Sequence, residues 1–445
     1  MTQCGKTFVA IDHMIRQLRE SPDSIYVVYT MNTLLNNEQF AKRLHVIEET
    51  YGSNSVMIFS SKYKGTYQHV KKLEELKTKT SLNPPRVVIM CSHYKRFIEG
   101  HQWIEYMNTI CPDVPIHIVY DELHQYIKAS LRRKIETVHD LECVKSIMAM
   151  TATPQMIIQK RGRWETIRMI THAALNLDGY ASVEDMKFHA VDDYFYMPYV
   201  KPVFNDFERM DEETIGFMEH VLDAHPDILA VGNRVFLPGH VRRQGHIVVR
   251  DVVLERNPKA VVVILNAMEK SLVYEDDAGE LYKIALRAAG MEEVCERIAT
   301  VMTEHHLEGR TLVITGFLCV GMGQTLTHHS MGNFTHSIIS HMGINNDAIY
   351  QLFGRITGRV KNWSTYQPTK LYCPTPIYHR VKVMETCAAE LIKHLQVDKE
   401  IYKKPMYEMP EGMDVIENER VVEKTAQRIV IDLDEDHEDI EDDDL

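Results

Sequence analysis

Residues that could bind a phosphate and activate a water molecule occur at several separate points of this chain. The first is Gly5-Lys6-Thr7 in TQCGKT, which matches the end of the phosphate-binding pattern G-x-x-x-x-G-K-[ST]. In that pattern the lysine reaches the β- and γ-phosphates, and the threonine hydroxyl helps to hold Mg²⁺. The first glycine of the pattern would fall before Met1, so the tripeptide by itself is a weak indication of a nucleotide site.

An acidic pair, Asp121-Glu122 in DELH, follows the apolar run 116–120. The carboxyl end of a buried parallel strand faces the crevice where ligands bind in α/β sheets. There Asp121 can hold Mg²⁺ through water, and Glu122 can orient and deprotonate a hydrolytic water. The alternative is a solvated helix N-terminus, which also favours acidic residues.

Two further motifs follow predicted strands. Thr151-Ala152-Thr153 comes directly after the apolar run 146–151. The segment TGFLCVGMGQTL, which begins at Thr315, places Gly321 and Gly323 in a loop after a strand. Both motifs are therefore expected at ligand-facing ends of strands.

A basic motif, YQLFGRITGR, follows near the end of the second half of the chain. Its spacing of four predicts that Gln351, Arg355 and Arg359 share one face of a helix. Arginine keeps its charge and forks onto oxyanions, so such a face could bind phosphates. A solvated basic face is the alternative, although Gly354 and Gly358 would weaken a helix that had no close neighbour.

The elements that must position these residues form two βα series. Near-continuous apolar runs are typical of parallel strands buried on both faces. The predicted strands are 25–30, 55–60, 86–92, 116–120 and 146–151 in the first series, and 233–237, 260–265, 311–315, 336–340 and 370–373 in the second. The fold class is therefore α/β, with doubly wound parallel sheets in two tandem domains at 1–175 and 215–400. The segments 240–257 and 280–305 are expected to be helices of the second domain.

The charge of the chain is concentrated at its end. The formal net charge is −13, and ten acidic residues lie between Asp432 and Asp444, which leaves about −3 for the rest. A surface that binds a polyanion is therefore compatible with the composition. Residues 406–445 are expected to form a disordered acidic tail, whose β-prone run 429–433 offers a partner strand for another protein as the alternative use.

The cysteines and hydropathy indicate an intracellular protein, in the nucleus or the cytoplasm. The eight cysteines are scattered without a C-x-x-C pair, which predicts reduced thiols and provides no zinc framework. We expect neither a secretory leader nor a membrane-spanning helix.

Taken together, G-K-T, D-E-L-H, T-A-T, T-x5-G-x-G-Q-T and Q-x-x-G-R-x-x-G-R resemble, in order, the motifs of superfamily 2 helicases of the DExD/H group. The resemblance covers about residues 1–375, and the wording of the later motifs is most similar to helicase-type ATPases of large DNA viruses. It implies two RecA-like domains, ATP and Mg²⁺ as cofactors, and DNA or RNA bound through its backbone without sequence preference. It implies a nucleic-acid-dependent ATPase with no membrane partner, and it adds a viral factory or virion to the expected locations.

The resemblance also implies a role for each motif residue. The nucleotide would be bound by Gln3, Cys4, Gly5, Lys6, Thr7, Gly321 and Gly323, with Thr7 and Asp121 on Mg²⁺. Catalysis would use Asp121, Glu122, Gln351, Arg355 and Arg359, with Arg355 preferred over Arg359 as the arginine that reaches the γ-phosphate. Coupling to nucleic acid would use Thr151, Thr153 and Thr315, and also Ser92 and Arg96 in CSHYKRF.

Three departures from the family pattern affect these expectations. The strand and first glycine that precede the phosphate loop are missing, which suggests a shortened start and weak ATP binding. Gly323 stands where the family carries an acid, and Gly358 stands where it carries the second arginine. A helicase-fold protein that binds nucleic acid with weak or no catalysis is therefore the alternative. A P-loop nucleotide kinase is disfavoured, because it needs no second α/β series.

Overall fold

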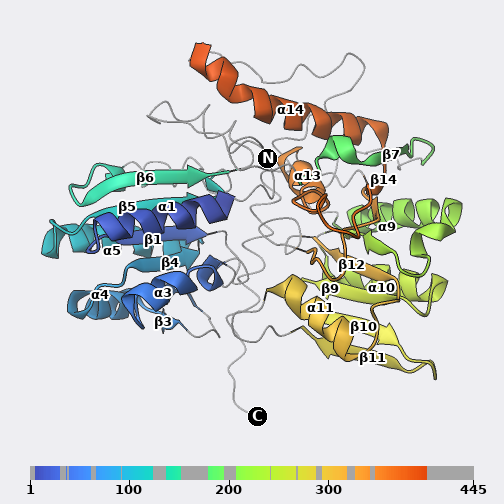
Figure 1. The fold of residues 1–445 in the computed structure, drawn as a ribbon, viewed down its shortest axis with the longest axis horizontal. Coiled ribbons are helices and arrows are strands. Elements are labelled where there is room, and N and C mark those ends of the chain that lie inside the picture. The colour runs from blue at the N-terminus through green and yellow to red at the C-terminus, as the bar shows by residue number, and fades with distance from the viewer. Residues whose placement is uncertain are drawn as a thin grey trace.

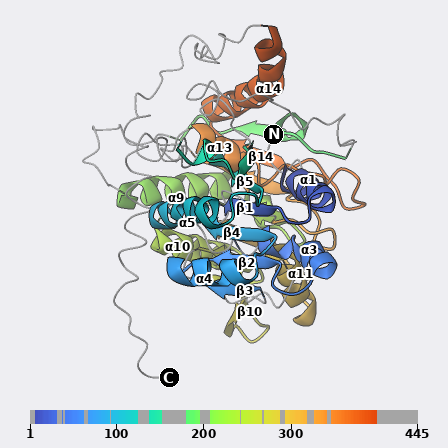
Figure 2. The ribbon, with the colours of Figure 1, turned by 90° about the vertical axis from the view of Figure 1, so that its left-hand side faces the viewer.

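The structure is a computed structural model, and it describes residues 6–30, 37, 40–61, 67–91, 93–123, 137–151, 179–194, 207–240, 242–266, 269–286, 293–317, 326–340 and 346–397. Two α/β units lie side by side, the first on the left of Figure 1 and the second on the right. Figure 2 views the molecule from the side of the first unit, whose helices α1 and α3 flank its sheet opposite α5 and α4. The predicted tail, 406–445, lies outside the described residues.

The first unit is built on a six-stranded parallel sheet with the strand order β3-β2-β4-β1-β5-β6. Its elements are α1 (Lys6–Glu20), β1 (Ile25–Thr30), α3 (His45–Tyr51), β2 (Val56–Phe59), β3 (Gln68–Val70), α4 (Leu73–Leu82), β4 (Val87–Cys91), α5 (Tyr94–Ile110), β5 (Ile116–Asp121) and β6 (Val144–Met150). All residues of β1, β2 and β4 are buried, as expected for strands covered by helices on both faces.

The second unit has an eight-stranded sheet with the order β11-β10-β9-β12-β8-β13-β14-β7. Its elements are β7 (Lys187–Ala190), α9 (Phe207–Ala224), β8 (Arg234–Phe236), α10 (Arg243–Arg256), β9 (Val261–Leu265), β10 (Lys270–Glu275), β11 (Leu281–Ala285), α11 (Val294–Glu304), β12 (Leu312–Gly316), β13 (His336–Ile338), α13 (Asn346–Phe353), β14 (Lys370–Cys373) and α14 (Thr375–Val397), with short 3₁₀ turns at Val183–Asp185 and Pro226–Leu229. Every pair is parallel except β9 with β10 and β10 with β11.

Each sheet has an apolar core on both of its faces. In the first unit, Trp103 and Phe97 of α5 pack on one face, and Met14 and Leu18 of α1 pack on the other. The buried Trp103 indole donates a hydrogen bond to the Thr80 hydroxyl of α4 at 3.0 Å, which satisfies its N–H group in the core. The packing fixes α1 and α5 against the strands that carry the site residues.

The predicted fold class, tandem doubly wound α/β domains, is confirmed, with three corrections to its detail. The second unit includes β7 and the whole of α9, so it begins before the predicted position 215. The predicted helix 280–305 is a hairpin strand, β11, followed by the shorter helix α11. Strand β3 is not among the predicted strands, because its three-residue sequence QHV shows no apolar run.

Candidate active site between the two units

The acidic pair stands at the carboxyl edge of the first sheet, as predicted. Asp121 is the last residue of β5, and its neighbour across the ladder is Met150, the last residue of β6. Thr151 follows Met150 directly and is partly buried. The edge therefore brings a carboxylate of β5 close to the threonine that follows β6.

Glu122 has an unusual backbone for a glutamate. Its φ is +53°, in the left-handed region that residues with a side chain rarely adopt, and its side chain is buried, with the residue 7% exposed. Strained backbone of this kind is concentrated at functional sites, where the surrounding structure holds it in place. The sharp bend after β5 turns Glu122 away from the strand direction and into the interior.

The phosphate-loop residues meet the same edge through α1. Helix α1 begins at Lys6, and a turn over residues 21–24 joins its end to the start of β1. Because so short a turn reverses the chain, α1 runs antiparallel to β1, and Lys6 and Thr7 lie at the carboxyl edge of the sheet. The first backbone N–H groups of a helix can bind a phosphate there. Gln3, Cys4 and Gly5 lie outside the described residues.

The arginine motif differs from the predicted helical stripe. Helix α13 ends at Phe353, so Arg355 lies in the turn that follows it, and its Nε donates to the Gln351 carbonyl oxygen at 3.3 Å. The expectation that Gln351, Arg355 and Arg359 share one helix face is therefore wrong. Gln351 and Arg355 are buried, whereas Arg359 is exposed, which separates the two arginines physically.

Arg355 of the second unit interacts electrostatically with Glu122 of the first unit. Burial lowers the pKa of Arg355 to about 10, while the Glu122 carboxylate and the Tyr180 hydroxyl act to raise it. Arg355 is 3% exposed, so its charge is held away from water and interacts strongly with groups nearby. A buried arginine of the second unit and a buried glutamate of the first unit therefore act on each other across the boundary between the units.

The remaining predicted residues are Thr315, Arg96 and four residues that the structure does not describe. Thr315 is fully buried within β12, and its Oγ1 has no hydrogen-bond partner among the residues that the structure describes. In this conformation solvent does not reach its hydroxyl, so contact with a nucleic-acid backbone would require rearrangement. Outside the described residues lie Ser92, Thr153, Gly321 and Gly323.

Arg96 has neighbours within its own unit. Its Nη1 pairs with Glu99 at 2.8 Å, one turn later on α5, and its guanidinium lies 4.6 Å from the centre of the Phe59 ring. Both contacts position the side chain on the surface of the first sheet. The role of Arg96 in binding a backbone stays a prediction.

A second contact joins the units, and no sequence motif pointed to it. Arg43, which precedes α3, donates to Glu293 Oε1 through Nη2 at 3.1 Å and through Nε at 3.2 Å. Glu293 is the N-cap of α11 and closes a capping box with Glu296. The two partners are 250 positions apart in the sequence, which explains why local sequence patterns could not reveal the pair.

The second unit also holds a buried acidic group that sequence reasoning missed. Asp211 of α9 is 5% exposed, and its Oδ1 lies 3.9 Å from His240 Nδ1, while Oδ2 lies 3.8 Å from Arg242 Nε. Burial raises the pKa of Asp211 to about 7, although the nearby Arg242 opposes the shift. A Cβ atom at Gly245 would come within 2.8 Å of Asp211 Oδ1, so glycine allows this close approach.

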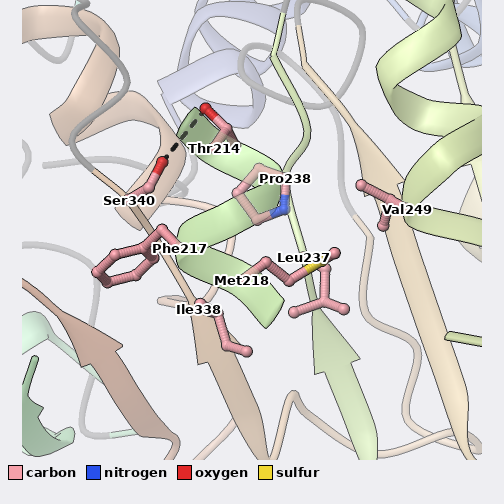
Figure 3. Close-up of a pocket in the computed structure, with 8 residues that line it drawn as sticks. All are labelled: Thr214, Phe217, Met218, Leu237, Pro238, Val249, Ile338 and Ser340. Carbon is pink, nitrogen blue, oxygen red and sulfur yellow. Dashed lines mark hydrogen bonds between the residues drawn. The ribbon is translucent and has the colours of Figure 1, made fainter. Parts of the chain in front are cut away.

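A small cavity lies beside α9 at the ends of β8 and β13 (Figure 3). It is lined by Thr214, Phe217, Met218, Leu237, Pro238, Val249, Ile338 and Ser340. The Ser340 hydroxyl donates to Thr214 Oγ1 at 3.4 Å, and the space open to a water-sized sphere is about 10 Å³. Such a volume accommodates about one water molecule, so the cavity is too small for a nucleotide.

Two other classes of site are absent from the described residues. No group of three or more histidine, cysteine or acidic side chains in the described ranges could hold a metal ion. No helix in that part of the chain has the length and apolar character needed to cross a membrane.

Comparison with known proteins gave a structural likeness. No protein-family model and no curated protein match the sequence. Among solved structures 43 chains match, including the DEAD-box helicase Mss116 bound to ssRNA and UDP-BeF. That match has 14% sequence identity and a TM-score of 0.43, and it covers 97% of this chain and 75% of the other. The candidate site therefore rests on the geometry and motifs of this chain itself.

Proposed function

We propose that this chain is an ATP-dependent nucleic-acid helicase or translocase of superfamily 2, which hydrolyses ATP between its two α/β units. The observation that carries the proposal is the placement of Arg355 and Glu122. Both are buried, they come from different units, and the carboxylate acts on the pKa of the guanidinium. A base on one side and an arginine on the other are the groups that stabilise transfer of a γ-phosphoryl group to water.

The nucleotide would lie at the carboxyl edge of the first sheet. Lys6 would bind phosphate oxygens together with the N–H groups at the start of α1. Thr7 and Asp121 would hold Mg²⁺, which prefers a few hard oxygen ligands and completes its shell with phosphates and water. The observed fit is that Asp121 ends β5 at the same edge where α1 begins.

Glu122 would act as the general base for the hydrolytic water, and Arg355 would stabilise charge on the γ-phosphate. In the structure the two groups attract each other, because Glu122 favours the charged form of Arg355. Binding of ATP would replace that attraction with contacts from Arg355 to phosphate oxygens, which frees the carboxylate for water. Gln351 would assist Arg355, since it lies buried one turn earlier.

Nucleic acid would bind through its sugar–phosphate backbone, with Thr151, Thr153 and Thr315 coupling the strand to the nucleotide site. Alternation between open and closed arrangements of the units would then change the grip on the strand. Binding of this kind is independent of nucleotide sequence. The logarithm of the affinity falls linearly with the logarithm of the salt concentration.

ATP turnover with and without single-stranded DNA or RNA tests the proposal. Wild-type chain should hydrolyse ATP faster with nucleic acid, and Glu122→Gln should bind ATP and nucleic acid with turnover reduced at least about 100-fold. Glu105→Gln is the matched control, because Glu105 is exposed on the outer side of α5. Nucleic-acid binding without any turnover in the wild-type chain would instead support a binding protein with a helicase fold.

A further inference from the structure

The backbone that carries Arg355 is held by a segment at the entry to the second unit. Ala181 and Gly358 form a two-way bridge, with Ala181 N–H donating to the Gly358 carbonyl at 2.7 Å and Gly358 N–H donating back at 3.0 Å. Lys361 N–H donates to the Gly179 carbonyl at 2.9 Å. Gly358 has a φ of +139°, which a residue with a side chain adopts with strain. The loop after α13 is therefore shaped by residues 179–181.

Tyr180 connects this segment to the arginine through side chains. It is 1% exposed, and its hydroxyl donates to Thr357 Oγ1 at 3.3 Å. The Thr357 hydroxyl donates in turn to the carbonyl oxygen of Gly354 at 3.1 Å. Gly354 directly precedes Arg355, so the relay ends on the peptide bond from which the arginine starts. The Tyr180 hydroxyl also favours the charged form of Arg355.

The segment is itself anchored in the second unit. Ser182 and Asp185 form a capping box, and Asp185 also pairs with Lys361 at 2.7 Å. Val183 is buried in the core, and its N–H donates to Glu385 of α14 at 3.3 Å. These contacts tie residues 179–185 to the arginine loop at one end and to α14 at the other. A shift of the segment would therefore move the loop with it.

We propose that Tyr180 is a positioning residue for Arg355, acting through the hydroxyl of Thr357 and the carbonyl of Gly354. The inference rests on the proposed function, because it assigns Arg355 a role in phosphoryl transfer. Arg355 lies beyond the last residue of α13, in a turn where its N–H donates to the Leu352 carbonyl oxygen at 2.9 Å. The relay adds a side-chain constraint on the adjoining Gly354 carbonyl, and a displacement of about 1 Å at a reacting group can cost about 100-fold in rate.

Isosteric variants test the relay in the full chain. Tyr180→Phe and Thr357→Val each remove one hydroxyl while retaining buried volume, and each should lower kcat for ATP about tenfold or more with little change in KM. Thr357→Ser keeps a hydroxyl and should retain most of the rate. Tyr372→Phe is the matched control, because Tyr372 is a buried tyrosine of the same unit that stacks on His189. It should behave as the wild type.

A double-mutant cycle separates positioning from a general loss of stability. In an Arg355→Ala background, Tyr180→Phe should cause no further loss of kcat, because its effect passes through the arginine. A further loss of tenfold in that background would overturn the inference, as would a wild-type kcat for Tyr180→Phe and Thr357→Val in an active chain. If the wild-type chain itself shows no nucleic-acid-stimulated turnover, the proposed function is refuted, and the positioning role of Tyr180 is refuted with it.

Discussion

Replacing Arg355 by lysine converts its burial into a measurable pH dependence. Burial lowers the pKa of Arg355 to about 10 from its ordinary value of 12.5. A lysine has an ordinary pKa of about 10.4, and the same burial would bring it to about 8. The wild-type side chain thus stays charged through neutral and mildly alkaline pH, whereas Arg355→Lys loses its charge near pH 8.

The assay is kcat/KM for ATP between pH 6 and pH 9.5 at saturating single-stranded nucleic acid, because this ratio reports groups of the nucleotide-free enzyme. Above pH 8 the Arg355→Lys variant should lose about tenfold per pH unit relative to the wild type. Arg359→Lys is the control, since Arg359 is exposed and its replacement should leave the profile parallel to the wild type. A profile of Arg355→Lys that runs parallel to the wild type up to pH 9.5 would show that the position is not desolvated, and would refute the reasoning.

Three further predictions concern the contact between the units and the buried titratable groups. Arg43→Gln should favour separation of the units by a few fold, because a partly exposed ion pair contributes up to about 1 kcal/mol, and small-angle scattering should show a larger radius of gyration. The pKa of Asp211 is raised to about 7, so the folded state holds its proton and the free energy of unfolding falls by up to about 4 kcal/mol as pH rises from about 4 to 7. Asp211→Asn should remove this loss, which urea unfolding at pH 5 and pH 8 would measure. The pKa of His336 is lowered to about 4, mainly by burial and then by Lys370, so its contribution of about 3 kcal/mol to the free energy of unfolding is present above pH 6.5 and is lost as pH falls toward 4. His336→Gln should reduce the loss of stability between pH 6.5 and pH 4 in the same assay.

The strands were predictable because burial on both faces leaves a local mark. A run such as VVIMC in β4 is apolar at every position, and the structure buries every one of its residues. The predicted strands do not include β11, whose sequence LYKIA is largely exposed. This strand lies at the edge of the sheet next to an antiparallel partner. A strand that buries little leaves no strong hydrophobic pattern.

The sequence predicted that the acidic pair follows a buried strand, and it did not predict the geometry of the arginine motif. The spacing of Gln351, Arg355 and Arg359 fits a helix, yet the helix ends at Phe353, just before Gly354. Glycine is a weak helix former, and the bridge from Ala181 to Gly358 offers the backbone another set of hydrogen bonds. That bridge joins residues 177 positions apart, so the local sequence around the arginines carries no sign of it.

The support of Arg355 suggests how movement of the units and chemistry would be linked. Residues 179–181 hold the loop after α13 through the bridge between Ala181 and Gly358, and they precede β7 of the second sheet. A shift of this segment would move the loop that carries Arg355. The same residues fix the loop from which Arg355 acts, and Arg355 interacts with Glu122 of the first unit. A shift of residues 179–181 would thus move the arginine at its backbone, and rotation of the units would change its interaction with Glu122 across the boundary. An arginine fixed within a continuous helix would experience the second effect without the first.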